Sequence, residues 1–167
     1  NGLRNNTTDW GKLLYQNAIN QQYGLSVSGG NDLSDYYFSL GYYDEQGSTI
    51  GTGFERYNLT LKNNFNISDR LTAGISIFAT SSDRNSFLTD ADASINPVYY
   101  SRNANPYLSP FNADGSYRYD QDIDGFEDVF IPFNFIEERN NSRYTLKNRA
   151  LKGILDLEYK IAKGLKV

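Results

Sequence analysis

One stretch of this 167-residue chain decides its fold: Tyr36-Tyr37-Phe38-Ser39-Leu40-Gly41-Tyr42-Tyr43. Its even-numbered positions are all aromatic or aliphatic, whereas its odd-numbered positions include serine and glycine. Because a β-strand turns successive side chains to opposite faces, the stretch predicts a strand with one apolar face and one mixed face.

The same alternation recurs in four other stretches, at residues 23–28, 56–67, 71 to about 80, and 150–161. The stretch 56–67 is the clearest, and Asn63 is the single lapse on its apolar side. The apolar rows of these four stretches are Tyr23, Leu25 and Val27; Tyr57, Leu59, Leu61, Phe65 and Ile67; Leu71, Ala73, Ile75, Ile77 and Ala79; and Leu151, Leu155, Leu157, Tyr159 and Ile161. Together the five stretches predict an all-β fold.

The connections between the predicted strands alternate in length. Along the chain they are short, medium, short, very long and short. An up-and-down membrane barrel has short turns on one side and longer loops on the other, and its strands cross the membrane in about 9–11 residues. We therefore predict an antiparallel up-and-down meander that forms part of a transmembrane β-barrel wall, with one long irregular outer loop.

Composition excludes several classes of protein. The hydrophobic fraction of 39% and the lack of a long apolar run argue against helical membrane spans. Cysteine and histidine are both absent, which removes thiol and imidazole ligands, nucleophiles and bases. The net charge of -4 argues against a nucleic-acid partner. We expect a protein that is not an enzyme, because no pair of carboxylates is placed for hydrolysis.

The alternation divides the chain into four predicted regions. They are a lead-in segment at 1–22, barrel strands at 23–80, a long extracellular loop at 81–149, and a barrel strand with the start of the next at 150–167. Position 1 is not methionine and no signal-peptide pattern opens the chain, so we expect an internal fragment of a longer envelope protein.

Several segments of the sequence resemble those of one known family. They are Thr8-Asp9-Trp10, the run from Tyr23 to Asn31, the run from Tyr36 to Tyr42, Glu45-Gln46-Gly47, and the run from Phe54 to Leu59. In this order and spacing they are similar to the SusC/RagA-like TonB-dependent outer-membrane transporters of Bacteroidetes. The resemblance covers about residues 8–80, and the later strand fits only generically.

The resemblance implies a function for the intact protein and for this part of it. The intact protein would be a large barrel in the cell outer membrane that imports oligosaccharides or peptides, with membrane lipid around it. TonB would act through a plug domain that we do not find in this chain, and a SusD-like surface lipoprotein would be the partner. This chain would contribute barrel wall and outer loop. The alternative is a soluble all-β carbohydrate-binding module of an envelope protein, because half-buried soluble strands also alternate.

One loop motif suggests a metal. The run Asp120-Gln121-Asp122-Ile123-Asp124-Gly125 matches the opening of a calcium loop, which presents carboxylates at alternate positions before a glycine turn. The twelfth position is Ile131 rather than glutamate, and Glu127 and Asp128 lie nearby as candidate substitutes. The candidate calcium ligands are Asp120, Asp122, Asp124 and Asp128. A solvated acidic loop and a basic partner surface are the alternatives.

The same loop is rich in aromatic residues. These side chains suit contacts with sugar rings or with a partner lipoprotein, beside polar groups that bond hydroxyls. The alternative is that a long ordered loop packs a small core of its own. The candidate contact residues are Tyr99, Tyr100, Arg102, Tyr107, Tyr117 and Tyr119.

Overall fold

The computed structural model describes residues 7–87, 96–119 and 133–167, and it divides into two compact units. The first unit comprises Asn1–Ala18, Gln46–Gly53 and Asn85–Thr145. The second comprises Ile19–Glu45, Phe54–Arg84 and Leu146–Val167.

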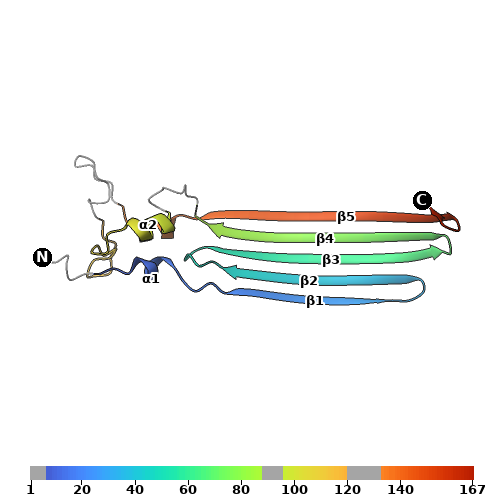
Figure 1. The fold of residues 1–167 in the computed structure, drawn as a ribbon, viewed down its shortest axis with the longest axis horizontal. Coiled ribbons are helices and arrows are strands. Elements are labelled where there is room, and N and C mark those ends of the chain that lie inside the picture. Colours follow the sequence, from blue (N-terminus) through green and yellow to red (C-terminus); the bar gives the residue numbers. More distant parts are fainter. Residues whose placement is uncertain (1–6, 88–95, 120–132) are drawn as a thin grey trace. The chain divides into compact units, whose positions relative to one another are not determined.

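The second unit is an antiparallel sheet whose six strands follow the chain order, as Figure 1 shows for the first five. Its strands are β1 (Asn20–Gly30), β2 (Ser34–Gln46), β3 (Gly53–Ser68), β4 (Leu71–Ser86), β5 (Tyr144–Ala162) and β6 (Leu165–Lys166). The sheet is an open meander, so the predicted all-β antiparallel fold class is confirmed.

The register between β1 and β2 brings the two apolar rows onto one face. Tyr23 lies opposite Tyr42, Leu25 opposite Leu40, and Val27 opposite Phe38. Tyr42 also packs against Tyr57 of β3, with ring centroids 4.8 Å apart. Because side chains opposite one another in antiparallel strands lie close enough to touch, these pairs stabilise the register.

The apolar face of the sheet is uncovered in the part of the chain that the structure describes. Leu151, Leu155 and Leu157 of β5 are 78%, 82% and 71% exposed, and Leu25 of β1 is 65% exposed. A soluble β-sandwich buries this face beneath a second sheet. The alternating leucines and tyrosines here meet no second layer of described residues, which is the geometry that a barrel wall requires.

Several strands extend beyond the residues that alternation predicts. Strand β4 continues to Ser86 and β5 begins at Tyr144, so both enter the range 81–149 that the sequence assigns to the loop. On the side of the apolar rows, these extensions carry polar residues such as Asp83 and Arg149. Backbone pairing needs no apolar side chain, so the ladder continues where the hydrophobic pattern stops.

Short turns close one end of the sheet. The Asn31 side-chain oxygen accepts hydrogen bonds from the amides of Leu33 and Ser34 between β1 and β2. Between β3 and β4, the Ser68 hydroxyl accepts from the amides of Arg70 and Leu71. The turn into β6 uses Gly164 at φ 86°, a conformation that favours glycine.

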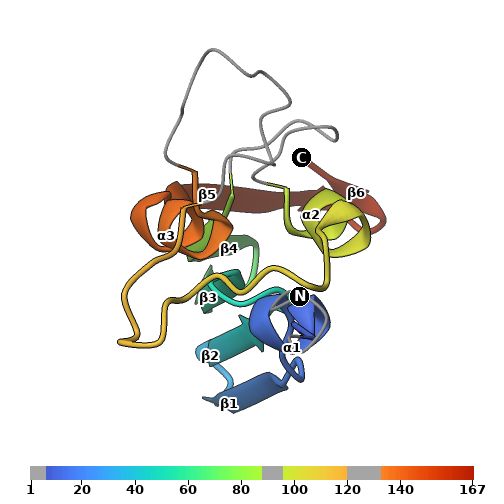
Figure 2. The ribbon, with the colours of Figure 1, turned by 90° about the vertical axis from the view of Figure 1, so that its left-hand side faces the viewer.

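The described residues of the first unit form three short helices, which Figure 2 shows end-on. They are α1 (Trp10–Leu14), α2 (Pro97–Asn103) and α3 (Phe135–Asn141). Asp9, Asn96 and Asn134 cap their N-termini by accepting hydrogen bonds from main-chain amides in the first turn. The described part of the long loop is therefore more ordered than the irregular loop that we predicted.

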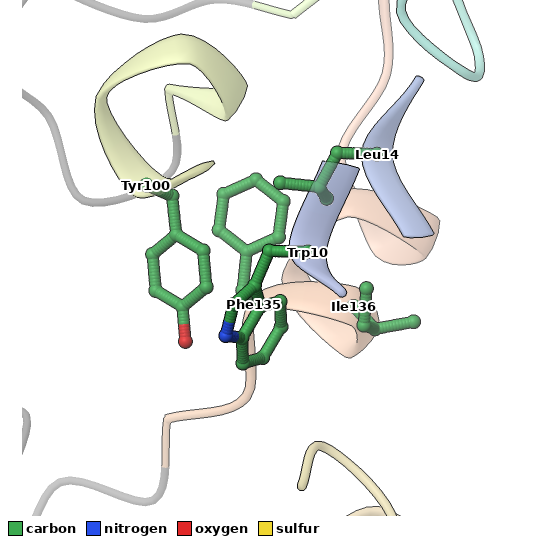
Figure 3. Packing of buried hydrophobic residues seen from close by; sticks show 5 residues of the cluster. All are labelled: Trp10, Leu14, Tyr100, Phe135 and Ile136. Carbon is green, nitrogen blue, oxygen red and sulfur yellow. The ribbon is translucent and has the colours of Figure 1, made fainter. Parts of the chain in front are cut away.

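The helices share a small apolar core, shown in Figure 3. Trp10 and Leu14 come from α1, Tyr100 from α2, and Phe135 and Ile136 from α3. The Tyr100 ring stacks on Phe135 at 4.3 Å between centroids and meets Trp10 edge-on at 5.0 Å. Residues from the lead-in segment and from the long loop thus fold together as one unit.

Candidate functional site

The second face of the sheet is polar and carries a ladder of hydrogen bonds between strands. Thr80 donates to Asn58 over 3.2 Å, and Asn64 donates to Asp35 over 2.8 Å. These residues stand at the alternate strand positions, so they lie on the face opposite the apolar rows. In a barrel with an apolar outer surface, this face lines the interior.

The polar face also carries a row of two aromatic side chains flanked by two arginines, where β2 and β4 end and β3 begins. The guanidinium carbon of Arg56 lies 5.6 Å from the centre of the Tyr43 ring. The guanidinium carbon of Arg84 lies 5.2 Å from the centre of the Phe54 ring. Tyr43 and Phe54 are themselves 6.0 Å apart between centroids, so the four side chains are continuous. We call them the arginine–aromatic row.

On the apolar face, a shallow groove of about 400 Å³ runs across the four neighbouring strands β2 to β5. Its walls include Leu59 of β3 and Leu151 of β5, and the small side chain of Ala79 in β4 lies between these strands. Beside it, Arg149 donates hydrogen bonds to the Asp83 carboxylate and to the Ser82 carbonyl oxygen. An apolar groove with an ion pair beside it suits contact with amphipathic molecules.

The candidate contact residues of α2 differ in exposure, because one is buried and the others are exposed. Tyr100 is only 8% exposed and belongs to the core of the first unit, which corrects its assignment as a substrate or partner contact. Its ring is needed to fill the space between Trp10 and Phe135. Tyr99 and Arg102 point outward and are exposed, as is Tyr107.

Tyr117 and Tyr119 lie beside α3. The Tyr117 ring stacks on Phe111, and its hydroxyl accepts a hydrogen bond from the Asn140 amide over 3.1 Å. The Tyr119 hydroxyl donates a short hydrogen bond to Glu137. That bond, followed by partial burial and the charge of Glu137, raises the pKa of Tyr119.

Arg139 of α3 ties this helix to α1. Arg139 donates a 2.7 Å hydrogen bond to the Leu13 carbonyl oxygen, and burial lowers the pKa of this guanidinium. Among the described residues of the first unit, the exposed aromatic side chains are Tyr99, Tyr107, Phe111, Tyr119 and Tyr144.

The predicted calcium ligands Asp120, Asp122, Asp124 and Asp128 lie outside the described residues. Within residues 7–87, 96–119 and 133–167, no group of three carboxylates is placed to hold a metal ion. In the same ranges, no helix has the length and apolar character to cross a membrane. The calcium site stays a prediction.

The arginine–aromatic row is not among the sites that we predicted from the sequence. Its members stand at alternating positions of their own strands, but each lies just outside or at the edge of a predicted strand. A signal was available in Phe54 and Arg56, an aromatic and a cation two residues apart and therefore on one face. Their pairing with Tyr43 and Arg84 depends on the register between strands.

Comparison with known proteins relates the chain to one class. No family model matches. The TonB-dependent receptor P3 of Formosa agariphila is 28% identical over 166 residues, which cover 94% of this chain and 16% of the receptor. The TonB-dependent receptor P39 of the same organism is 34% identical over 67 residues, or 40% of this chain and 6% of the receptor. The chain thus spans less than a fifth of the length of either receptor.

Among solved structures, a chain of the RagAB peptide transporter has a similar fold. The TM-score is 0.65 at 22% sequence identity, and the match covers 97% of this chain and 18% of that chain. None of the three relatives is named as an enzyme. The chain is thus similar in sequence to TonB-dependent receptors and similar in fold to a chain of the RagAB transporter, and the predicted resemblance to the SusC/RagA-like TonB-dependent transporters is confirmed.

Proposed function

We propose that this chain is a segment of the barrel wall and outer loop of a TonB-dependent nutrient importer in the cell outer membrane. The apolar face of the sheet contacts lipid, and the polar face lines the pore. The protein moves its substrate across the membrane and does not transform it chemically.

The observation that carries the proposal is the uncovered apolar face. Leu155 and Leu157 of β5 are 82% and 71% exposed, whereas Asp156 between them lies on the polar face. A contiguous apolar face of this kind is costly in water and is stabilised in hydrocarbon. The match to TonB-dependent receptors supports the same conclusion.

Rows of tyrosine support a membrane position. Tyr23, Tyr42 and Tyr57 stand side by side on neighbouring strands of the apolar face, with centroids 6.3 and 4.8 Å apart. Tyrosines collect at the boundary between lipid and water, because one end of the ring is apolar and the hydroxyl is wet. We assign this row to the outer boundary of the hydrocarbon region.

The partners follow from the same proposal. TonB supplies energy through the plug domain of the whole protein, and a SusD-like surface lipoprotein captures the oligosaccharide or peptide substrate. The exposed aromatics of the first unit, Tyr99, Tyr107 and Tyr119, with Arg102, offer a contact surface for that lipoprotein or for substrate. No nucleic acid is involved.

Spin labelling of the full-length protein in lipid vesicles tests the orientation. Nitroxides at Leu155 and Leu157 are expected to collide with oxygen dissolved in lipid, and a nitroxide at Asp156 with a water-soluble nickel complex. The opposite pattern would refute the assignment of the faces. Uptake of labelled oligosaccharides and peptides by cells with and without TonB then tests import itself.

The alternative, a soluble carbohydrate-binding module, makes a different prediction. Such a module remains monomeric without detergent, whereas an open sheet with an exposed apolar face and unpaired edges self-associates. Gel filtration of the chain without detergent distinguishes the two. The exposure of Leu151 and Leu155 favours the barrel.

A further inference from the structure

The arginine–aromatic row has a chemistry that a structural role alone does not require. Arg56 and Arg84 are exposed, while Tyr43 and Phe54 between them are half-buried. Among the residues that the structure describes, neither guanidinium makes an ion pair or a hydrogen bond. Two permanent positive charges therefore stand on the pore-facing side with their N–H donors unused.

The nearby carboxylate offsets only one of the two positive charges. Glu45 lies on the same face, and its carboxylate accepts a hydrogen bond from the Tyr43 hydroxyl over 3.0 Å. By strand parity, Asp44 and Glu55 belong to the opposite face of the sheet. The two arginines and the single carboxylate of Glu45 leave this row with a net positive charge.

Stacking prepares the two guanidinium groups for recognition. Each stands over an aromatic ring, an arrangement that restrains a guanidinium. A guanidinium presents five N–H donors in a planar fork that matches carboxylate, sulfate or phosphate oxygens. Restraining it in advance lowers the conformational cost of binding.

We propose that the arginine–aromatic row is a binding subsite on the pore wall for an oxyanion group of the transported substrate, such as a carboxylate or a sulfate. This inference rests on the proposed function, because it places the row inside the barrel. It narrows the substrate class to nutrients that carry acidic groups. Arg56 and Arg84 bind the oxyanion, and Tyr43 and Phe54 hold them in position.

Arginine-specific labelling of the full-length protein in detergent tests the site. Phenylglyoxal modification of Arg56 and Arg84 is followed by mass spectrometry while inorganic phosphate, the probe oxyanion, replaces chloride at constant ionic strength. Phosphate is expected to protect both residues. Arg149, which is paired with Asp83 on the opposite face, serves as the internal control and is expected to be unaffected.

Variants sharpen the test. Arg56→Gln is expected to raise the phosphate concentration that half-protects Arg84 by about tenfold, since a charge-assisted hydrogen bond is lost. Lys62→Gln is the matched control. It removes one positive charge on the same face of the same strand, from a lysine stacked on Phe78 at 5.7 Å. It is expected to leave the protection of Arg56 and Arg84 unchanged.

Three results would overturn the proposal. They are no protection by phosphate, equal protection of Arg149, and an equal loss of protection in Lys62→Gln, which would show only a diffuse positive field. Failure of Arg56 and Arg84 to react even in chloride would show that another part of the protein covers them, and it too would overturn the proposal. Labelling measures binding without transport, so these failures are distinct from a failure of the spin-label test of the proposed function.

Discussion

Tyr36 lies across Gly29 in the neighbouring strand, and a Cβ on Gly29 would stand 2.7 Å from the Tyr36 hydroxyl oxygen. The aromatic ring covers the gap that the missing side chain leaves, a known device for stabilising glycine in a sheet. The pair lies on the apolar face beside the first short turn. Its ring therefore helps to position the end of the β1–β2 hairpin.

Three glycines of β1 are predicted to respond differently to alanine. Gly30→Ala is expected to destabilise by about 1–3 kcal/mol, because its Cβ would meet the Ser34 carbonyl oxygen at 2.8 Å. Gly29→Ala is expected to cost less, since the Tyr36 ring can swing aside. Denaturant unfolding of the full-length protein in lipid vesicles measures the free energy of unfolding of each variant.

Gly24→Ala is the control for both glycine substitutions. A Cβ at Gly24 would have nothing within 4 Å, so alanine is expected to stabilise by about 0.5–1 kcal/mol through the loss of chain entropy in the unfolded state. If the three variants lost equal stability, the steric explanation would be wrong.

Asn63 is predicted to weaken the barrel wall. It interrupts the apolar row of β3, and its side-chain oxygen is buried without a hydrogen-bond partner among the described residues. Asn63→Leu is expected to stabilise by about 1–3 kcal/mol, since an unsatisfied polar atom leaves the apolar face. Asn64→Leu, the neighbouring change on the polar face, breaks the hydrogen bond to Asp35 and is expected to destabilise. The measurement is the change in unfolding free energy relative to the wild type. Changes of opposite sign in the two variants would agree with this account, and changes of the same sign would contradict it.

A lysine introduced on the apolar face of β5 is predicted to destabilise the protein more than a lysine introduced on its polar face. Leu155→Lys is expected to destabilise by about 2–4 kcal/mol if the residue lies near the middle of the bilayer. Asp156→Lys, one residue along and on the polar face, is expected to change stability by less than about 1 kcal/mol. Folding titrations in lipid vesicles compare them. Similar costs for both would argue against a lipid-facing row.

The core of the first unit predicts a local loss of structure in Tyr100→Ala. Removing a buried aromatic ring costs about 3–5 kcal/mol, and this ring contacts both Trp10 and Phe135. Hydrogen exchange is expected to rise in residues 7–15 and 133–141 of the full-length protein. Tyr99→Ala removes an exposed ring from the same helix and is expected to leave exchange there unchanged. Unchanged exchange in Tyr100→Ala would show that the core does not hold these segments.

A pH dependence is predicted for the turn at residues 112–116. The Ser116 hydroxyl and amide donate to the Asp114 carboxylate over 2.7 and 3.0 Å, and these bonds lower the pKa of Asp114 from its ordinary value of 3.8. A lowered folded-state pKa means that the stabilisation is complete above 3.8 and is lost as pH falls through the folded-state value. Pepsin cleavage of this turn is expected to be faster in Asp114→Asn than in the wild type at the upper end of the acidic range, and the difference is expected to vanish at lower pH. A difference that persists at the lowest pH would refute the linkage.

Much of this protein was predictable from sequence because strand alternation is a local property. The apolar and polar rows, the short turns at Asn31 and Ser68, and the meander order need only neighbouring residues and the two-residue period of a strand. The ends of β4 and β5 were not predictable in the same way. Ser86 and Tyr144 lie where the hydrophobic pattern has stopped but backbone pairing continues.

Contacts between residues far apart in the chain depend on the three-dimensional fold. Trp10, Tyr100 and Phe135 share a core although long stretches of chain separate them, because three helices too short to be stable alone bury their apolar sides together. Arg56 reaches Tyr43, and Arg84 reaches Phe54, only through the register between strands, since a slip of one residue would send each side chain to the other face. Alternation along the chain thus predicts a sheet with one apolar face, whereas the register between strands brings the arginines and aromatic rings together on the polar face.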